Sequence, residues 1–261
     1  EGMTAPNPVV GSVIVLDGII IGEGYHLKAG MPHAEVNAVN SVIDKSLLSR
    51  STLYVNLEPC CHFGKTPPCT DLIISRRIPR IVVGTPDTSE KISGGGIKKL
   101  KDAGCEVVTG LLESECRWVN RRFFSFHEKK RPYIILKWAQ SADGFIDILR
   151  SESQRTGPHW ISGKPERTLV HRWRASEGSI LAGAGTIRAD NPMLNVRDWS
   201  GKDPLKLVLC GSGDLPADAA VFRTGGETVI FTSDKKAGYQ DHTKILIEEG
   251  RSAASQILSF L

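Results

Sequence analysis

The sequence predicts an α/β protein of two domains. The chain has 261 residues, which is enough for two domains of ordinary size, each with its own hydrophobic core. Strand-like and helix-like segments alternate in both halves, as is typical of α/β folds. Between the halves, the polar and charged segment His127–Pro132 ends in a proline. We therefore predict one domain at residues 1–126 and a second domain at residues 132–261.

The first half contains a strong hairpin signal and several alternating strands and helices. Asp17-Gly18 is a preferred two-residue turn, and it lies between two apolar strand-like runs. Val36, Val39 and Ile43 are spaced to share one face of a helix. The expected strands are residues 9–16, 19–24, 52–57, 80–84 and 106–109, and the expected helices are residues 34–43, 71–77, 113–126 and a segment ending at Gly104.

The second half repeats this alternation with different lengths. The expected strands are residues 133–139, 179–182, 206–210, 228–232 and 244–247, and the expected helices are residues 164–173 and 252–261. No repeat at a fixed period is visible, and no segment is of low complexity. Both halves therefore have the elements of an α/β domain.

The composition restricts the class of protein and of partner. Hydrophobic residues make up 40% of the chain and charged residues 24%, values typical of soluble globular proteins. The longest apolar runs have the length of strands, so no transmembrane helix is expected. A net charge of +4 allows an anionic small-molecule substrate and does not require nucleic acid. We expect neither a membrane nor a nucleic-acid partner.

The six cysteines are not spread as a disulfide framework. Three of them, Cys60, Cys61 and Cys69, lie within one short segment. In a chain of this size, such clustering favours a metal site in a reducing compartment. We therefore expect a cytoplasmic protein, and we also expect it to form homo-oligomers.

The most informative motif is His33-Ala34-Glu35, followed by Pro59-Cys60 and by Cys69. This order of residues is the signature of zinc-dependent base deaminases. One neutral imidazole and two thiolates suit a tetrahedral zinc ion that keeps its fourth position open for water. We predict that His33, Cys60 and Cys69 are the zinc ligands.

Glu35 is the expected proton shuttle of this site. Side chains two residues apart diverge by about 200° around a helix, so His33 and Glu35 share a site only where a helix begins. The alternative is a closed structural zinc site, with Cys61 or His62 as the fourth ligand. Such a site has no use for the glutamate, and we therefore favour catalysis.

The spacing of the cysteines departs from the general deaminase pattern. Eight residues separate Cys60 from Cys69, where two are usual. The inserted segment Cys61–Pro68 carries polar groups that could line a pocket for an anionic substrate.

Together these motifs resemble one family. The segments Thr4–Gly11 (TAPNPVVG), His33–Glu35 (HAE) and Glu58–Cys69 (EPCCHFGKTPPC) resemble the deaminase domain of the bifunctional riboflavin-biosynthesis deaminase–reductases. Lys137–Gly144 (KWAQSADG) and Gly183–Pro192 (GAGTIRADNP) resemble the reductase domain of the same family. The resemblance implies a cytidine-deaminase-like domain followed by a dihydrofolate-reductase-like domain, with Zn²⁺ and NADPH as cofactors.

The resemblance also implies two reactions. The first is the hydrolytic deamination of 2,5-diamino-6-(5-phosphoribosylamino)pyrimidin-4(3H)-one, a phosphorylated pyrimidine. The second is the NADPH-dependent reduction of its ribosyl side chain to ribityl. Two alternatives remain. One is a deaminase of a base in tRNA or another nucleotide with a non-catalytic second domain, and the other is a zinc-stabilised binding module.

Site residues follow from the resemblance by position. The deaminase substrate is expected to meet Asn7, His26, His62, Lys65 and Asp87. NADPH is expected to meet Ala139, Trp160, Gly183, Gly185, Thr186 and Asp190. The reductase substrate is expected to meet Lys137, Arg174, Leu194 and Arg197.

Several of these residues have a plainer interpretation. His26 could be a surface histidine, Asp87 could cap a turn, and Arg174 could complement a helix dipole. A glycine pair such as Gly183 and Gly185 more often marks a tight turn than a nucleotide site.

The chain also departs from the family pattern. The stretch Phe145–Pro158 is longer than usual, and Pro158 stands where a small polar substrate contact is typical. A later Glu-Gly-Gly segment is expected, but only Glu248-Glu249-Gly250 resembles it, and it lies too early. We therefore expect the sequence to be C-terminally incomplete relative to the family.

Overall fold

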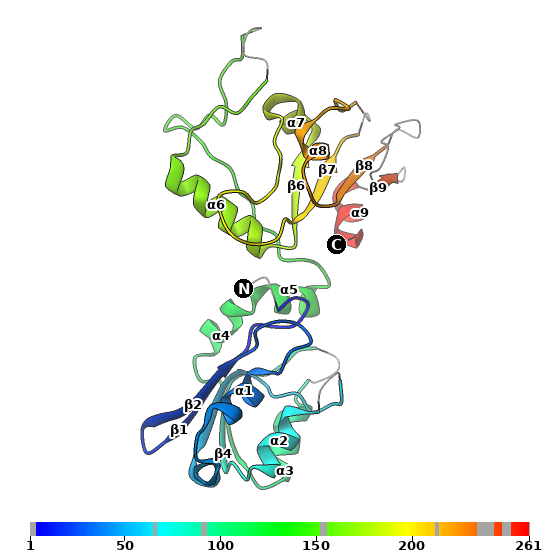
Figure 1. Cartoon of the computed structure of the whole chain (residues 1–261). Helices are drawn as coiled ribbons and strands as arrows, with labels where there is room; N and C mark the ends of the chain where they lie inside the picture. Colours follow the sequence, from blue (N-terminus) through cyan, green and yellow to red (C-terminus); the bar gives the residue numbers. More distant parts are fainter. Residues whose placement is uncertain are drawn as a thin grey trace. The chain divides into compact units, whose positions relative to one another are not determined.

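A computed structural model describes residues 4–64, 67–89, 93–151, 156–211, 214–233, 243–246 and 252–260. The described residues form two compact units that divide between Tyr133 and Ile134 (Figure 1). None of the helices in these ranges is long and apolar enough to cross a membrane.

The first unit is built on a five-stranded sheet in the order β2-β1-β3-β4-β5. Its strands are β1 (Gly11–Leu16), β2 (Ile19–Tyr25), β3 (Thr52–Leu57), β4 (Arg80–Thr85) and β5 (Glu106–Thr109). β1 is antiparallel to β2 and β3, whereas β3, β4 and β5 are parallel. The β1–β2 hairpin turns at Asp17 and Gly18, where φ is +50° and +80°. Positive φ at both positions is typical of the predicted two-residue turn, which is confirmed.

Helices pack against this sheet. The first unit contains α1 (Ala34–Ser41), the 3₁₀ helix η1 (Lys45–Arg50), α2 (Cys69–Ser75), α3 (Gly95–Asp102), α4 (Glu113–Val119) and α5 (Arg121–Lys129). The buried core joins Val39 of α1, Ile73 of α2 and Leu100 of α3 to Leu53 and Ile81 of the sheet. This core fixes the starts of α1 and α2 beside the end of β3.

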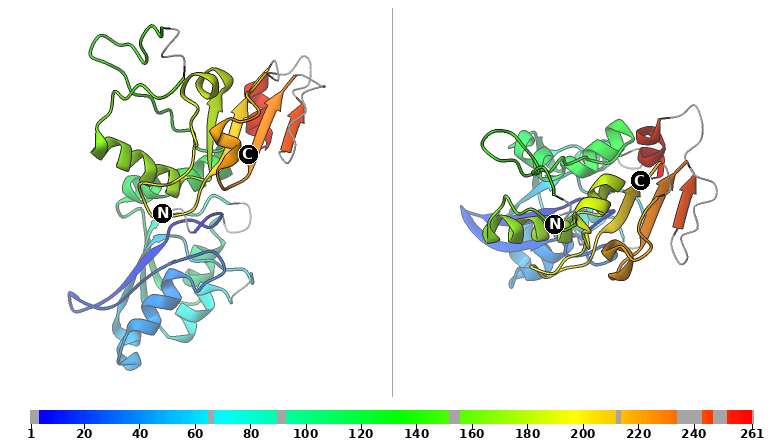
Figure 2. Two further views of the ribbon diagram at one scale, coloured as in Figure 1. Left: turned by 45° about the horizontal axis from the view of Figure 1, so that its top comes forward. Right: turned by 90° about the horizontal axis from the view of Figure 1, so that it is seen from above.

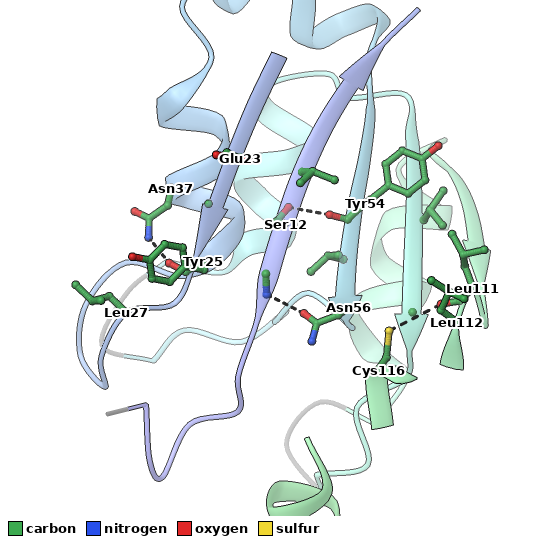
Figure 3. A pocket seen from close by; sticks show the side chains of 16 residues that line it. Ser12, Glu23, Tyr25, Leu27, Asn37, Tyr54, Asn56, Leu111, Leu112 and Cys116 are labelled. Atoms are coloured by element: carbon green, nitrogen blue, oxygen red, sulfur yellow. Dashed lines mark hydrogen bonds between the residues drawn. The ribbon is translucent and has the colours of Figure 1, made fainter. Parts of the chain in front are cut away.

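The opposite sheet face carries an apolar groove of about 750 Å³ (Figure 3). Because side chains alternate along strands, Tyr54 and Val82 face this groove while their neighbours Leu53 and Ile81 face the helices. Cys116 of α4 lies at the groove and packs closely on Gly84 of β4, where an added Cβ would be 2.3 Å from its sulfur. The groove therefore lies on the other side of the sheet from α2, and Asn37 of α1 also lines it.

Two predictions in this unit are wrong. The segment 113–126 was expected to be one helix, but it breaks into α4 and α5 at Asn120 (φ −99°, ψ 19°). The side chain of Asn120 accepts a hydrogen bond from the backbone N–H of Val9 (2.8 Å) and donates one to its carbonyl (2.9 Å). The helix expected to reach Ile43 ends at Ser41, and Ile43 is 99% exposed. Lys45 ends α1 by donating to the carbonyls of Val39 and Asn40.

The second unit is a parallel sheet covered on both faces (Figure 2). Its strands follow the order β6 (Ser179–Gly183), β7 (Leu205–Leu209), β8 (Thr228–Thr232) and β9 (Thr243–Leu246). Its helices are α6 (Lys164–Ser176), α7 (Ala184–Asp190), α8 (Ala220–Arg223) and α9 (Ala253–Phe260). Val208 and Ile230 pack with α7 and α8 on one face, and Leu207 and Phe231 pack with α9 on the other. Burial on both faces explains why these strands read as continuous apolar runs.

One predicted strand of this unit is wrong. Residues 133–139 lie in an irregular segment, and within the described part of the chain they pair with no strand. Ile134 and Leu136 are 50% and 79% exposed. An apolar run becomes a strand only when a neighbouring strand satisfies its backbone groups, and the run alone does not supply that neighbour. The last expected strand position, Ile247, lies outside the described residues.

Candidate metal centre and anion site

Three potential zinc ligands meet at the ends of α1, α2 and β3. His33 is the N-cap of α1, Cys69 is the first residue of α2, and Cys60 follows β3. Nδ1 of His33 lies 3.5 Å from Sγ of Cys60 and 3.3 Å from Sγ of Cys69. The backbone N–H of Cys69 also donates to Sγ of Cys60 (3.3 Å). The sequence predicts that His33 and Glu35 share a site where a helix begins, and both lie at the start of α1.

These distances fit a tetrahedral zinc ion. Zn–S bonds of about 2.3 Å and Zn–N bonds of about 2.0 Å at a tetrahedral angle separate sulfur from nitrogen by roughly 3.5 Å. Among the described residues, the cluster contains His33, Cys60 and Cys69, and neither Cys61 nor His62 joins it. Three protein ligands leave one coordination position for water, which favours a catalytic over a closed structural site.

Of the two thiols, Cys60 loses its proton more readily and Cys69 keeps its proton. The hydrogen bond from the Cys69 thiol, followed by that from His33, lowers the pKa of Cys60 to about 4 although burial opposes ionisation. The same bond with Cys60, together with burial, raises the pKa of Cys69. The hydrogen bond with Cys60 raises the pKa of His33. Cation binding therefore has to release the proton of Cys69, since zinc takes thiolates.

Glu35 lies beside the ligands and away from solvent. Its side chain is in the first turn of α1 and only 3% exposed. Burial raises the pKa of the Glu35 carboxyl, and a hydrogen bond with the Cys69 side chain acts in the opposite direction. A carboxyl group with a raised pKa next to a metal is suited to take up and release a proton.

Asn7 and His26 extend the site. The Asn7 amide nitrogen lies 3.1 Å from Nε2 of His26, and Nδ1 of His26 lies 3.1 Å from the carbonyl oxygen of Pro32. The rings of His26 and His33 meet edge to face with centroids 5.4 Å apart. His26 is 5% exposed, so it is not a surface histidine.

The other deaminase residues are placed less uniformly. Asp87 is 3% exposed and follows β4, beside the end of β3. Burial raises the pKa of the Asp87 carboxyl, and Asp87 also accepts a bond from the Ser89 N–H (2.7 Å), as a turn cap would. His62 is exposed, and Lys65 lies outside the described residues.

The sequence analysis missed Glu58, which organises this edge of the sheet. Glu58 is 4% exposed, and its carboxylate accepts four backbone N–H groups. The sequence around Glu58 does not predict this role, because its four hydrogen-bond partners come from a distant part of the chain.

In the second unit, the two predicted glycines lie where β6 meets α7. Gly183 ends β6 and is the N-cap of α7, and Gly185 and Thr186 lie in the first turn. A Cβ atom built on Gly183 or Gly185 would have no heavy atom within 4 Å. Open space at these positions would let a ligand phosphate approach the backbone.

The remaining nucleotide residues surround α7 only in part. Asp190 ends α7 and pairs with Arg150 (2.6 Å). Trp160 is 53% exposed, with the guanidinium of Arg167 4.4 Å from its ring centre. Ala139 lies on the irregular segment that the sequence predicted as a strand.

The four predicted reductase-substrate residues include a cluster of positive charge. Nη1 of Arg174 donates to the carbonyl of Asn195 (3.1 Å), and its Nε is buried without a partner among the described residues. Burial and the neighbouring Arg197 lower the pKa of Arg174. Burial and Arg174 lower the pKa of Lys137. Leu194, in the left-handed region at φ +55°, is 5% exposed. An unpaired buried donor among cations is suited to an anion.

His171 is a second residue that the sequence analysis missed. Its Nδ1 accepts the backbone N–H of Arg197 (3.2 Å), and its Nε2 lies 3.4 Å from the Asp198 carboxylate. Burial, then Arg174 and Arg197, lower the pKa of His171. His171 and Arg174 are three residues apart on α6 and therefore contact the same segment.

Comparison with known proteins agrees with both halves of this description. The family "Cytidine and deoxycytidylate deaminase zinc-binding region" matches residues 1–85, and the family "RibD C-terminal domain" matches residues 132–256. The riboflavin biosynthesis protein RibD of Aquifex aeolicus is 43% identical over 237 residues, which are 90% of this chain and 65% of the relative. RibD of Actinobacillus pleuropneumoniae is 45% identical over 88% of this chain and 60% of the relative.

Solved structures decide the family. A diaminohydroxyphosphoribosylaminopyrimidine deaminase/5-amino-6-(5-phosphoribosylamino)uracil reductase from Thermotoga maritima superposes with a TM-score of 0.88 at 40% identity, covering 100% of this chain and 72% of that chain. The chain belongs to the RibD family. RibD of Acinetobacter baumannii superposes with a TM-score of 0.81 at 33% identity, covering 99% of this chain and 72% of its own.

Membership of the RibD family confirms the predicted fold class, a cytidine-deaminase-like domain followed by a reductase-type domain. The chain spans 65% and 60% of the length of the Aquifex and Actinobacillus RibD proteins.

Proposed function

We propose that this protein is a bifunctional enzyme of riboflavin synthesis. Its first activity is the zinc-dependent hydrolytic deamination of 2,5-diamino-6-(5-phosphoribosylamino)pyrimidin-4(3H)-one. Its second activity is the NADPH-dependent reduction of the ribosyl group of the product to ribityl. The observation that carries the proposal is the cluster of His33, Cys60 and Cys69 with the buried carboxyl group of Glu35 beside it.

In the deamination, this chain's residues hold the metal and move protons. When bound by His33, Cys60 and Cys69, zinc supplies a water molecule whose pKa is lowered to roughly 7. Glu35 would accept one proton of the attacking water and deliver it to a nitrogen of the pyrimidine ring. It would then move the second proton of that water to the departing amine, which leaves as ammonia. Burial favours this role, because it raises the pKa of the Glu35 carboxyl above that of an exposed glutamate.

The substrate is held by groups around this centre. Asn7 hydrogen-bonds an edge of the pyrimidine ring, and His26 and Asp87 complete the wall of the site. His62 and Lys65 come from the inserted segment after Cys60, and Lys65 pairs with the substrate phosphate. This arrangement accounts for the length of the insertion, since a base without a phosphate would not need it.

In the reduction, the second domain aligns cofactor and sugar. Gly183, Gly185 and Thr186 would hold NADPH, with further contacts from Ala139, Trp160 and Asp190, and the cofactor would supply the hydride chemistry when bound. The phosphate of the substrate accepts a hydrogen bond from the unpaired Nε–H of Arg174. Arg197, Lys137 and Leu194 surround the phosphate. Arginine is suited to this because its planar fork matches phosphate oxygens.

Two further expectations remain predictions. These are the homo-oligomeric state and the cytoplasmic location. The cytoplasmic location is favoured because zinc-binding thiols need a reducing environment. We do not favour a tRNA-base deaminase with a non-catalytic second domain, because residues 132–256 match the RibD C-terminal domain family.

The proposal is tested by incubating the intact protein with the diaminopyrimidine nucleotide, with and without NADPH. We expect ammonia release in both cases and NADPH oxidation only after deamination. NADPH oxidation without ammonia release would contradict the order of the two reactions. Absence of both products from folded, zinc-loaded protein would contradict the function.

A further inference from the structure

The carboxylate of Glu58 accepts hydrogen bonds from four backbone N–H groups. Oε2 accepts from Asp87 (3.0 Å) and Gly94 (3.1 Å), and Oε1 accepts from Gly96 (2.8 Å) and Ile97 (3.0 Å). The side chain is 4% exposed, so these bonds are shielded from water. Two of the donors belong to the first turn of α3, whose free N–H groups favour a carboxylate.

The position of Glu58 links these bonds to the active site. β3 and β4 are parallel, with Leu57 opposite Thr85, so the residues after them lie at one edge of the sheet. Glu58 leads through Pro59 to the ligand Cys60, and Asp87 follows β4 by two residues. The bond from the Asp87 N–H to Glu58 therefore ties the Asp87 backbone to the strand that carries a zinc ligand.

The packing around Glu58 leaves little freedom. A Cβ atom on Gly96 would lie 2.1 Å from the Pro59 carbonyl oxygen and 3.2 Å from Oε1 of Glu58. The start of α3 can thus approach the Glu58–Pro59 segment only through a glycine. Because all four partners are donors, an amide at position 58 would place its NH₂ group against two of them.

We propose that Glu58 is a positioning residue of the deaminase, which sets the distance of Asp87 from the metal through the Asp87 backbone. Glu58 touches neither metal nor substrate in this account. The inference rests on the proposed function, in which Asp87 contacts the substrate. Loss of the Glu58 carboxylate then displaces Asp87, so that substrate binding suffers and the proton transfer at Glu35 does not.

The test is a double-mutant cycle on the intact protein with Glu58→Gln, Asp87→Ala and the double variant. For Glu58→Gln we expect a KM about tenfold higher with kcat nearly unchanged, because the displaced Asp87 weakens substrate binding by about one hydrogen bond. Zinc content should stay that of the wild type. If Glu58 acts through Asp87, the double variant should be no worse than Asp87→Ala alone.

Asp71→Asn is the matched control, because it removes the ion pair between Asp71 of α2 and Lys99 of α3 (2.5 Å) and leaves the hydrogen bonds of Glu58 in place. Its KM should remain that of the wild type. Glu58→Asp, which keeps the charge but shortens the side chain, should have an intermediate KM and covers the case in which Glu58→Gln does not fold.

The outcomes separate the inference from the proposed function. An unchanged KM in Glu58→Gln, or costs that add in the double variant, would overturn the inference alone. Loss of zinc or folding in both Glu58 variants would assign Glu58 to the fold and also overturn it. An unchanged KM in Asp87→Ala would instead contradict the role of Asp87 in the proposed function.

Discussion

Asn7 and His26 form a hydrogen-bonded pair, and the other ring nitrogen of His26 lies at the carbonyl of Pro32, the residue before His33. The Asn7 amide lies 3.1 Å from Nε2 of His26, and Nδ1 of His26 lies 3.1 Å from the Pro32 carbonyl. The carbonyl can only accept, so Nδ1 carries the proton and Nε2 accepts from Asn7. His26 thus connects the N-terminal segment to the start of α1.

This tautomer predicts different effects for two substitutions of His26. In His26→Gln the terminal oxygen can replace Nε2 and keep Asn7 in place, whereas His26→Asn reaches only as far as Nδ1. We expect His26→Asn to lower deaminase kcat/KM about tenfold, corresponding to about 1.4 kcal/mol for one hydrogen bond. His26→Gln should lose clearly less. Steady-state ammonia release checks this, and equal losses in both variants would contradict the pairing.

The hydrogen bonds of Asn120 predict that its substitution lowers the stability of the first unit. Its buried side chain bonds both backbone groups of Val9 and so holds the segment that carries Asn7. Asn120→Ala leaves the Val9 N–H without its partner, while the Val9 carbonyl keeps the hydrogen bond from the Asn56 side chain (3.0 Å). The substitution should lower the free energy of unfolding of the first unit by about 1–3 kcal/mol. Denaturant titration measures this. Asn40→Ala, at an exposed position of α1, is the control and should change it by less than about 0.5 kcal/mol. Indistinguishable curves for the two variants would argue against the role of Asn120.

Arg174 predicts a specific loss of phosphate binding. In Arg174→Lys the positive charge remains, but the planar fork and its buried Nε are gone. We expect KM of the reductase for the phosphorylated substrate to rise about tenfold or more, corresponding to at least about 1.4 kcal/mol for a bond to a charged group. Arg172→Lys is the matched control on the same helix, since Arg172 faces the ring of Trp199. A substrate without phosphate should not distinguish Arg174→Lys from the wild type. If the substrate without phosphate also has a higher KM with Arg174→Lys, Arg174 stabilises α6 and does not bind the phosphate.

His171 predicts a pH dependence of the second unit. Burial, then Arg174 and Arg197, lower the pKa of His171 in the folded state, and Asp198 opposes this. Unfolded histidine titrates near 6.5, so between this value and the lower folded pKa the unfolded state binds more protons. The corresponding stability is present above about pH 6.5 and is lost as pH falls through the folded pKa.

Thermal unfolding between pH 7 and pH 5 tests this dependence. His171→Asn keeps an acceptor for the Arg197 N–H but does not titrate, and its stability should fall less steeply than that of the wild type as pH is lowered. Parallel curves for the two proteins would show that His171 does not take up a proton on unfolding.

These features show which parts of the fold follow from the sequence. The Asp17-Gly18 turn is decided by its own two residues, and the sequence predicts it correctly. The cluster of His33, Cys60 and Cys69 is likewise predictable, because zinc chemistry demands these residue types together. The turn depends on two adjacent residues, and the cluster depends on residue types that a shared metal explains although they are up to 36 residues apart.

Other features depend on partners distant in the sequence, and the sequence did not reveal them. The break at Asn120 arises from bonds to Val9, 111 residues earlier, while the local helical pattern continues across it. Glu58 and His171 are single polar residues whose partners are backbone N–H groups, which have no signature in side-chain chemistry. Residues 133–139 have a strand-like pattern, but a pattern does not provide the neighbouring strand.

The central claim is that a zinc ion held by three ligands works with Glu35, which is not one of them. The most direct measurement is zinc content and ammonia release for the wild type and for Glu35→Gln, made on the same preparations. We predict equal zinc content in both proteins and a fall in ammonia release of about 10²–10⁴-fold in Glu35→Gln. Loss of zinc on this substitution, or ammonia release close to that of the wild type, would contradict the account.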